Sequence, residues 1–198
     1  DKPFEPDNYT DKIDSQKLKS ANTLLSISEL KTDKTIGRKN QALLDKLLLL
    51  LSKSKRGIIF CGPGFYTKVF IKECLAVSNK LSFPILADGS SNIRFLPPSQ
   101  NKLIHNFPNM FRTREIRKAF DAEVIIQIGK APTSQGMLSY FEETSAKLFL
   151  VNEFGDNHDP SNSAEGIFKM EPLEFLKILN QKIVQTNTLS NELTLFIK

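Results

Sequence analysis

Gly62-Pro63-Gly64 follows a short apolar run and precedes a helical pattern, which is the setting in which a helix N-terminus binds phosphate. A dinucleotide-binding fingerprint would have another Gly three positions later, where this chain has Thr67. A P-loop would have Gly-Lys-Ser or Gly-Lys-Thr, which the chain lacks. The spacing therefore favours a tight turn over a nucleotide-binding loop, and both interpretations stay open at this point.

A second polar segment, residues 88–92 (Asp-Gly-Ser-Ser-Asn), carries oxygen atoms of the kind that bind cations. It is similar to the Gly-Asp-Gly-Ser sequence that opens the magnesium and diphosphate site of thiamine enzymes. However, Ala87 replaces the first Gly, and no suitable Asn follows at the expected distance. The segment also fails as a calcium loop, because Ile93 stands where that loop needs its Gly. We therefore expect it to bind neither metal nor diphosphate.

The histidines and cysteines form no reactive constellation in the sequence. His158 has Asp156 and Asp159 beside it, and capping of turns by these polar side chains is favoured over a metal site. Cys61 and Cys74 lack metal-binding spacing and are expected to be reduced thiols in the core. No Ser/His/Asp order and no Cys/His pair stands out. The sequence thus nominates no catalytic, cofactor-binding or metal-binding residue.

The composition is that of a globular protein with a mildly basic balance. The chain has 198 residues, of which 40% are hydrophobic and 25% charged, and its formal net charge is +5. No apolar run approaches the ~20 residues of a membrane helix, and the first residues lack a signal-peptide pattern. We expect a cytoplasmic protein with no membrane partner. Nucleic acid is not an expected partner either, because the basic excess is spread along the first part of the chain without an RNA-binding motif.

Short apolar runs alternate with helical patterns along most of the chain. Strands are expected at residues 57–61, 83–87, 124–128, 148–151 and 166–170, and helices at residues 37–53, 65–79, 112–120, 135–145 and 173–184. The runs 58–60 and 124–126 do not alternate polar with apolar residues, as expected for strands covered by helices on both faces. The pattern predicts an α/β fold, a Rossmann-like doubly wound parallel sheet of five or six strands flanked by helices.

The ends of the chain differ in character from this alternating region. Residues 1–35 are polar, rich in lysine and weakly periodic, so they are expected to form an N-terminal polar arm that packs on the domain. Residues 36–198 are expected to form a single Rossmann-like domain. Within it, residues 193–197 are a candidate for a sixth strand.

Several short segments, taken in order, resemble a known family. They are residues 2–6, 56–62, 84–94, 128–134 and 151–160. Together they are similar to the central domain of 2-succinyl-5-enolpyruvyl-6-hydroxy-3-cyclohexene-1-carboxylate (SEPHCHC) synthase, a thiamine-diphosphate enzyme of menaquinone biosynthesis. The similarity extends from residue 1 to about residue 183, and it rests on the order and spacing of the motifs.

The resemblance implies a function for the whole enzyme of which this chain would be one domain. SEPHCHC synthases decarboxylate 2-oxoglutarate and add the succinyl unit to isochorismate, using thiamine diphosphate and Mg²⁺ bound by their first and third domains. By resemblance, the chain is a scaffold excised from a three-domain enzyme and is not catalytic by itself, and no cofactor is expected in it. Its implied partners are the flanking domains of the same polypeptide and, in the full-length enzyme, other copies of that polypeptide.

The resemblance also nominates residues that face the substrate. The loop Thr133-Ser134-Gln135 is expected to reach toward the anionic substrate cavity, with Gln135 standing where relatives often have Lys. Gln offers neutral hydrogen bonds rather than charge attraction to a carboxylate, which weakens that role. Arg94 closes the loop after Asp88 and is either an anion-binding residue or, more simply, a partner of a local acid.

Two other functions remain open from the sequence. The first is an independent Rossmann-like module that binds an adenine nucleotide, with Asp88 available for a ribose. The second is nucleic-acid binding through the basic arm, which would depend on salt.

Overall fold

The computed structural model describes residues 38–97, 102–104 and 106–183. The expected polar arm at residues 1–35 and the candidate strand at residues 193–197 lie outside these ranges. All elements discussed below belong to the compact unit Gly37–Lys198.

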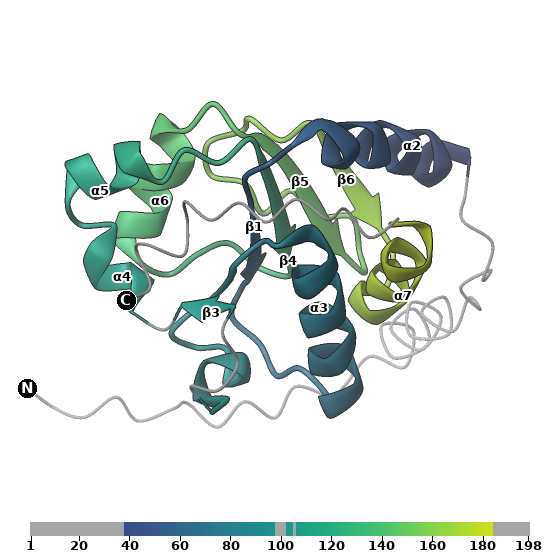
Figure 1. Cartoon of the computed structure of the whole chain (residues 1–198), viewed down its shortest axis with the longest axis horizontal. Helices are drawn as coiled ribbons and strands as arrows, with labels where there is room; N and C mark the ends of the chain where they lie inside the picture. Colours follow the sequence, from purple (N-terminus) through teal and green to yellow (C-terminus); the bar gives the residue numbers. More distant parts are fainter. Residues whose placement is uncertain (1–37, 98–101, 105, 184–198) are drawn as a thin grey trace, which may run out of the picture. The chain divides into compact units, whose positions relative to one another are not determined.

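Six parallel strands form one sheet in the order β3-β2-β1-β4-β5-β6 (Figure 1). Their bounds are β1 Gly57–Cys61, β2 Ile85–Ala87, β3 Leu103–Ile104, β4 Val124–Ile128, β5 Lys147–Asn152 and β6 Gly166–Lys169. The chain starts at β1, moves outward through β2 and β3, and then returns to the other side of β1 to add β4, β5 and β6. This is the expected doubly wound sheet, with its switch point between β1 and β4.

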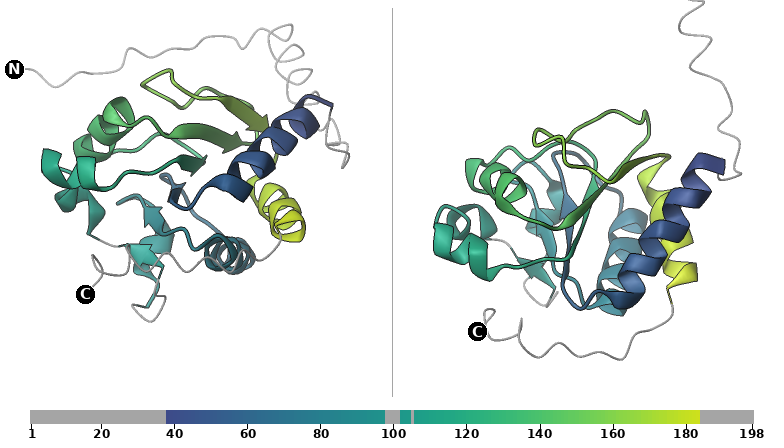
Figure 2. Two further views of the ribbon diagram at one scale, coloured as in Figure 1. Left: turned by 45° about the horizontal axis from the view of Figure 1, so that its top comes forward. Right: turned by 90° about the horizontal axis from the view of Figure 1, so that it is seen from above.

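Helices cover both faces of the sheet (Figure 2). On one face lie α2 (Arg38–Lys53), α3 (Lys68–Leu81) and α7 (Pro172–Lys182), and on the other lie α4 (Phe107–Met110), α5 (Arg114–Ala119) and α6 (Gln135–Glu143). Every residue of β1 and β4 is buried, as the apolar runs 58–60 and 124–126 predict, and the buried strand β4 also includes the polar Gln127.

Aromatic rings fill the core on the α4–α6 side. The Phe60 ring on β1 meets Phe107 and Phe141 edge-on, with centroids 6.3 and 5.8 Å apart. Phe111 packs against Tyr140 at 4.8 Å. Such contacts add about 0.5–1.5 kcal/mol each beyond the burial of apolar area. The helices at this face are short, so their place is fixed by these rings rather than by helix propensity.

The structure differs from the expected helices and strands at three places. The sixth strand among the described residues is Leu103–Ile104, a segment that the apolar pattern did not single out. The expected helix at residues 112–120 is present as the shorter α5, and α4, which precedes it, is a helix that the pattern did not single out. The helix expected to begin at residue 65 begins at Lys68, because the Thr67 side chain accepts a hydrogen bond from Phe70 N and caps it.

Among the described residues, no helix is both long enough and apolar enough to cross a membrane.

Candidate functional site

The loops that follow the strands meet at one edge, since all strands are parallel. At this carboxyl edge lie the loop after β1, the loop after β2 and the loop after β4, which correspond to residues 62–67, 88–91 and 129–134. Open α/β sheets bind their ligands at this edge, beside the switch point. The three loops are therefore the candidate site.

The switch point itself is tightly closed by backbone contacts. Gly62 N donates to Ile128 O at 2.9 Å, and a Cβ added to Gly62 would lie 2.1 Å from Lys130 O. The Tyr66 hydroxyl lies 3.0 Å from Gly62 O and 3.2 Å from Ile128 O. It thus joins the ends of β1 and β4 where a Rossmann-like domain would admit a dinucleotide. This geometry supports the tight-turn interpretation of Gly62-Pro63-Gly64.

Tyr66 also explains the glycine that follows β4. Gly129 has φ +79°, a left-handed conformation that favours glycine, and a Cβ there would approach the Tyr66 hydroxyl to 2.9 Å. Burial raises the pKa of Tyr66 well above its ordinary value, and negative charge on Cys61, Cys74 or Asp88 would act in the same direction. The phenol therefore remains a protonated donor, not an acid–base group.

Asp88 ties the loop after β2 to the loop after β4. Its carboxylate is fully buried and accepts hydrogen bonds from Ser90 N and Thr133 N, each at 2.9 Å. The Thr133 hydroxyl lies 2.9 Å from both carboxylate oxygens and donates to one of them at a time. Because β1 lies between β2 and β4, this connection crosses over the end of β1.

These contacts test whether residues 88–92 fit a magnesium–diphosphate group. Both Asp88 oxygens already accept hydrogen bonds from within the chain, and the side chain is closed to solvent. A magnesium ligand needs a carboxylate oxygen free to face the ion. The segment therefore does not fit the group that its sequence resembles.

Hydrogen bonds also join the loop after β1 to the segment after β2. Gly64 forms an isolated parallel bridge with Ser91. Beside it, Asn92 Oδ1 accepts from Tyr66 N at 2.8 Å, and Asn92 Nδ2 donates to Tyr66 O at 2.9 Å. Sequence reasoning placed Tyr66 in a helix and assigned no role to Asn92. The only sequence feature that could have indicated the role of Asn92 is a side-chain amide within a turn, which can bond to nearby backbone.

The four residues expected to face the substrate all lie at this carboxyl edge. Thr133 and Gln135 are exposed, and Ser134 is half-buried with its hydroxyl accepting from Met137 N as the cap of α6. Arg94 is exposed, and its Nη1 would lie 3.3 Å from a Cβ on Gly89. The Asp88–Thr133 connection thus brings the two predicted segments to adjacent positions. Their role toward a substrate stays a prediction.

The loop after β5 is built by turn capping. The buried Asp159 carboxylate accepts from the backbone N–H groups of Ser161, Ser163 and Ala164, and Asn157 Oδ1 accepts from Asp159 N. His158 Nε2 is 3.8 Å from Asp156 Oδ2. Within the part of the chain that the structure describes, no three or more His, Cys, Asp or Glu side chains gather as a metal site. The capping interpretation is confirmed for Asp159, whereas the Asp156 carboxylate lies beside His158.

The two cysteines are free thiols in the core, as expected. Their Sγ atoms lie 3.9 Å apart between β1 and α3. The hydrogen bond with Cys74, followed by burial, raises the pKa of Cys61 well above its ordinary value. The Cys61 thiol is therefore not poised as a nucleophile, and the Cys74 thiol is buried away from solvent.

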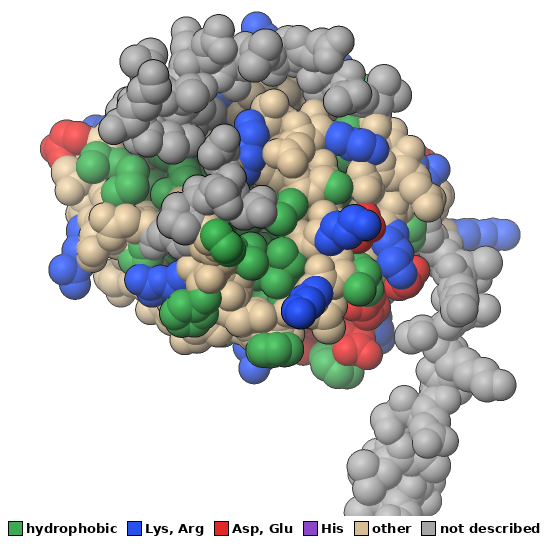
Figure 3. Space-filling model, turned by 60° about the horizontal axis from the view of Figure 1, so that its bottom comes forward, with side chains coloured by type: hydrophobic (Ala, Val, Ile, Leu, Met, Phe, Trp, Pro, Cys, Tyr) green, Lys and Arg blue, Asp and Glu red, His purple; other side chains and the backbone are tan. Residues whose placement is uncertain are grey.

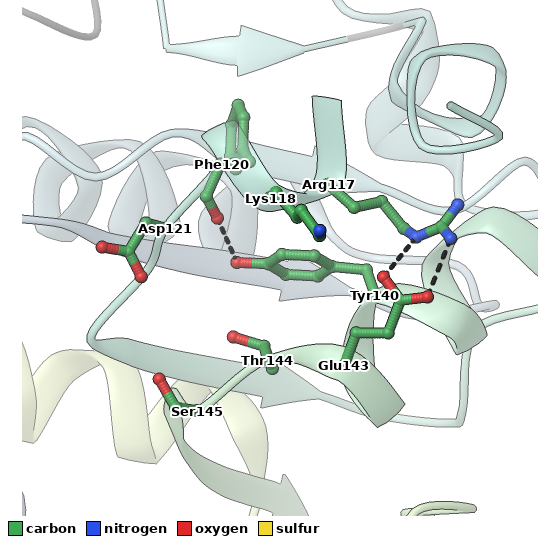
Figure 4. Close-up of a pocket in the computed structure, with 8 residues that line it drawn as sticks. All are labelled: Arg117, Lys118, Phe120, Asp121, Tyr140, Glu143, Thr144 and Ser145. Carbon is green, nitrogen blue, oxygen red and sulfur yellow. Dashed lines mark hydrogen bonds and ion pairs between the residues drawn. The ribbon is translucent and has the colours of Figure 1, made fainter. Parts of the chain in front are cut away.

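A separate pocket of about 200 Å³ lies at the opposite, amino edge of the sheet (Figure 4). Arg117 and Glu143 form a two-pronged ion pair beside it, at 3.0 and 2.9 Å. The buried Tyr140 hydroxyl donates to Phe120 O at 2.7 Å, and burial raises the pKa of Tyr140 to about 12. The Arg117–Glu143 pair and the Tyr140 hydroxyl are thus engaged within the chain, and we take the carboxyl edge as the candidate site because open α/β sheets bind their ligands there.

Comparison with known proteins agrees with the resemblance. No family model matches the chain. It is 30% identical over 145 residues to SEPHCHC synthase of Sorangium cellulosum, which covers 71% of this chain and 24% of that protein. It is 24% identical over 196 residues to SEPHCHC synthase of Trichodesmium erythraeum, which covers 98% of this chain and 33% of that protein. The chain thus spans about a quarter to a third of the length of these curated relatives.

Among solved structures, the chain resembles a thiamine-diphosphate-dependent 4-hydroxybenzoylformate decarboxylase of Rhodococcus jostii RHA1. The TM-score is 0.50 at 11% identity, and the match covers 75% of this chain and 28% of that one. At this identity the likeness concerns the fold alone. Taken with the sequence relatives, it identifies the chain as a SEPHCHC-synthase-like domain with the parallel α/β fold of thiamine-diphosphate-dependent enzymes.

Proposed function

We propose that this chain is the central scaffold domain of a thiamine-diphosphate-dependent SEPHCHC synthase. The whole enzyme would decarboxylate 2-oxoglutarate and add the succinyl unit to isochorismate in menaquinone biosynthesis, as a cytoplasmic homo-oligomer. The observation that carries the proposal is the match of 98% of this chain to one third of a SEPHCHC synthase. Because the chain corresponds to one third of that enzyme, the other two thirds would supply the cofactor site.

The chemistry of the described residues supports a scaffold role for this domain. Asp88, the residue nearest to a magnesium motif, is committed to internal hydrogen bonds, and the Tyr66 hydroxyl is held between two strand ends. Thiamine diphosphate and Mg²⁺ would therefore be bound by the flanking domains. The cofactor supplies the carbanion chemistry, and the protein supplies its binding and orientation. We assign no step of the reaction to residues of this chain.

The contribution of this domain to the substrate cavity would come from its rigid carboxyl edge. Asp88 holds Thr133 in place, and Thr133 in turn fixes the start of α6, where Gln135 is exposed. Arg94 carries the positive charge nearest to Asp88 on the loop after β2. Both substrates of the proposed reaction are carboxylates, and a guanidinium binds a carboxylate through charge-assisted hydrogen bonds. We therefore assign anion attraction to Arg94 and neutral hydrogen bonding to Gln135.

The test uses the longer polypeptide encoded with this chain. Its thiamine-dependent decarboxylation of 2-oxoglutarate is measured with isochorismate present, and the 198-residue chain serves as the control. Activity in the long protein and none in the short one is the expected result. An inactive long protein, or a gene without thiamine-binding segments, would contradict the proposal.

A ligand titration addresses the alternative of an independent nucleotide-binding module. The chain is titrated with ADP, NAD and FAD. We expect no binding at micromolar concentrations, because Tyr66 and the contact between Gly62 and Lys130 occupy the switch point. Micromolar binding of any of the three would favour the module over the scaffold.

A further inference from the structure

Two phenylalanine rings at the carboxyl edge are almost fully exposed. Phe65, in the loop after β1, is 86% exposed, and Phe95, after β2, is 80% exposed. Val69, in the first turn of α3, is 53% exposed. We call these three side chains the apolar pad. Single exposed apolar residues are common, but several on adjoining loops mark a surface that binds another surface.

The loops that carry the pad are held together before anything binds. Phe65 and Phe95 lie one and three residues from the reciprocal hydrogen bonds between Tyr66 and Asn92. The bridge between Gly64 and Ser91 extends the same connection. A preorganised surface loses little conformational entropy when it binds. The pad therefore has the rigidity expected of a docking surface.

The surroundings of the pad are basic. Lys68, Arg94 and Lys130 are exposed on the segments around it, and the one carboxylate in residues 62–68, 88–97 and 129–135 is the buried Asp88. Figure 3, which turns the lower side of Figure 1 forward, shows hydrophobic side chains interspersed with Lys and Arg, together with Asp and Glu gathered mostly toward one side. A complementary surface would be apolar and bordered by carboxylates.

We infer that the apolar pad is the docking surface for a flanking domain of the same, longer polypeptide, whose contacting surface is apolar with acidic groups at its rim. This inference rests on the proposed function, in which two thirds or more of the polypeptide lies outside this chain. The pad adjoins the loop that Asp88 ties to Thr133. Docking there places the flanking domain beside the residues proposed to face the substrate.

Hydroxyl-radical footprinting of the unmodified longer protein tests the inference without any substitution. The oxidation rates of Phe65 and Phe95 are measured by mass spectrometry in the native and the denatured protein. Docking predicts that both rings react at least about fivefold more slowly in the native state, whereas the exposures in this chain alone predict little protection. Native rates within about twofold of the denatured rates would overturn the inference.

A pair of variants of the longer protein provides a second measurement. F65D/F95D places carboxylates against the apolar part of the proposed partner surface, and F154D is the control outside the pad, because Phe154 is 70% exposed in the loop after β5. We expect the first variant to lower the thermal unfolding midpoint by several degrees and the control to leave it within about one degree. Equal midpoints for the two variants would count against docking at the pad.

The two proposals fail in different ways. Protected rings in a wild-type protein without carboligase activity would remove the proposed function and leave the docking surface. Exposed rings in an active protein would remove the docking surface and leave the function.

Discussion

The amino and carboxyl edges of the sheet differ in the side chains that they expose to solvent. At the amino edge the surface is charged: Arg117 pairs with Glu143, and Arg56 lies 2.9 Å from Asp121 and 3.5 Å from Glu123. At the carboxyl edge the loops are joined by backbone contacts and one buried carboxylate, while the rings of Phe65 and Phe95 face outward. Paired charges are compatible with water, whereas a rigid apolar surface is compatible with a partner. On this contrast we propose that the carboxyl edge, and not the amino edge, contacts a partner.

The largest effect is expected where the backbone of the carboxyl edge is closest. Gly62→Ala would place a Cβ 2.1 Å from Lys130 O, which is backbone and cannot swing away. We expect a loss of about 3 kcal/mol in the free energy of unfolding, measured by urea denaturation of the chain. Gly89→Ala is the control, because its Cβ would meet only the end of the Arg94 side chain at 3.3 Å. Equal losses in the two variants would show that the strand ends are not packed as described.

The next effect concerns the buried carboxylate. Asp88→Ala would leave Thr133 N and Ser90 N without their acceptor, at a cost of about 2–3 kcal/mol in unfolding free energy. Asp121→Ala, at the amino edge, removes a carboxylate that is 61% exposed and would cost less than about 1 kcal/mol. If urea denaturation gave Asp121→Ala the larger cost, the contrast between the edges would be wrong.

A smaller effect compares one tyrosine at each edge. Tyr66→Phe removes the hydroxyl that joins the ends of β1 and β4, and Tyr140→Phe removes the hydroxyl that donates to Phe120 O. Each change should lower the unfolding free energy by about 1 kcal/mol, because each removes one intramolecular hydrogen bond, although Phe120 O keeps the donor Ala122 N. In the longer protein, Tyr66→Phe should also reduce carboligase activity, while Tyr140→Phe should not. The opposite pattern of activity would place the functional site at the amino edge.

The smallest effect is the pH dependence of the amino-edge ion pair. The hydrogen bonds from Arg117 lower the pKa of Glu143 below its ordinary value of 4.5. A lowered pKa in the folded state stabilises the fold above the unfolded-state pKa, and this stability is lost as the pH falls through the folded-state pKa. The stability that wild type has in excess of Glu143→Gln should thus be lost as the pH falls from about 5 to about 3. If the difference in unfolding midpoint between wild type and Glu143→Gln stays constant over this pH range, ionisation of Glu143 is not coupled to folding.

Much of the sheet could be predicted from the sequence because buried parallel strands have a simple signature. The apolar runs 58–60 in β1 and 124–126 in β4 do not alternate with polar residues, which is typical of strands covered by helices on both sides. The two-residue strand Leu103–Ile104 is too short to carry any pattern. Phe65 and Tyr66 fit the periodicity of the helix that follows them, so only the cap at Thr67 marks the true start.

The sequence predicts which loops meet at the carboxyl edge but not the hydrogen bonds that join them. The carboxyl edge follows from the parallel strands, and with it the neighbourhood of Thr133 and Arg94. The hydrogen bonds of Asp88 with Thr133 join residues 45 positions apart, across a strand whose place in the sheet the sequence does not reveal. The Tyr66 hydroxyl was missed for the same reason, since Ile128 lies 62 positions away.

The connection from Asp88 across the end of β1 to Thr133 has a consequence for how this domain evolves and how it can be rebuilt. Neither loop can be exchanged alone, because a residue without a hydroxyl at position 133 removes a donor from the buried Asp88 carboxylate, and a new residue at position 88 leaves Thr133 N without its acceptor. Among homologous sequences, positions 88 and 133 should therefore covary. A chimera that takes the loop after β4 from a relative should fold well only when it also takes the loop after β2.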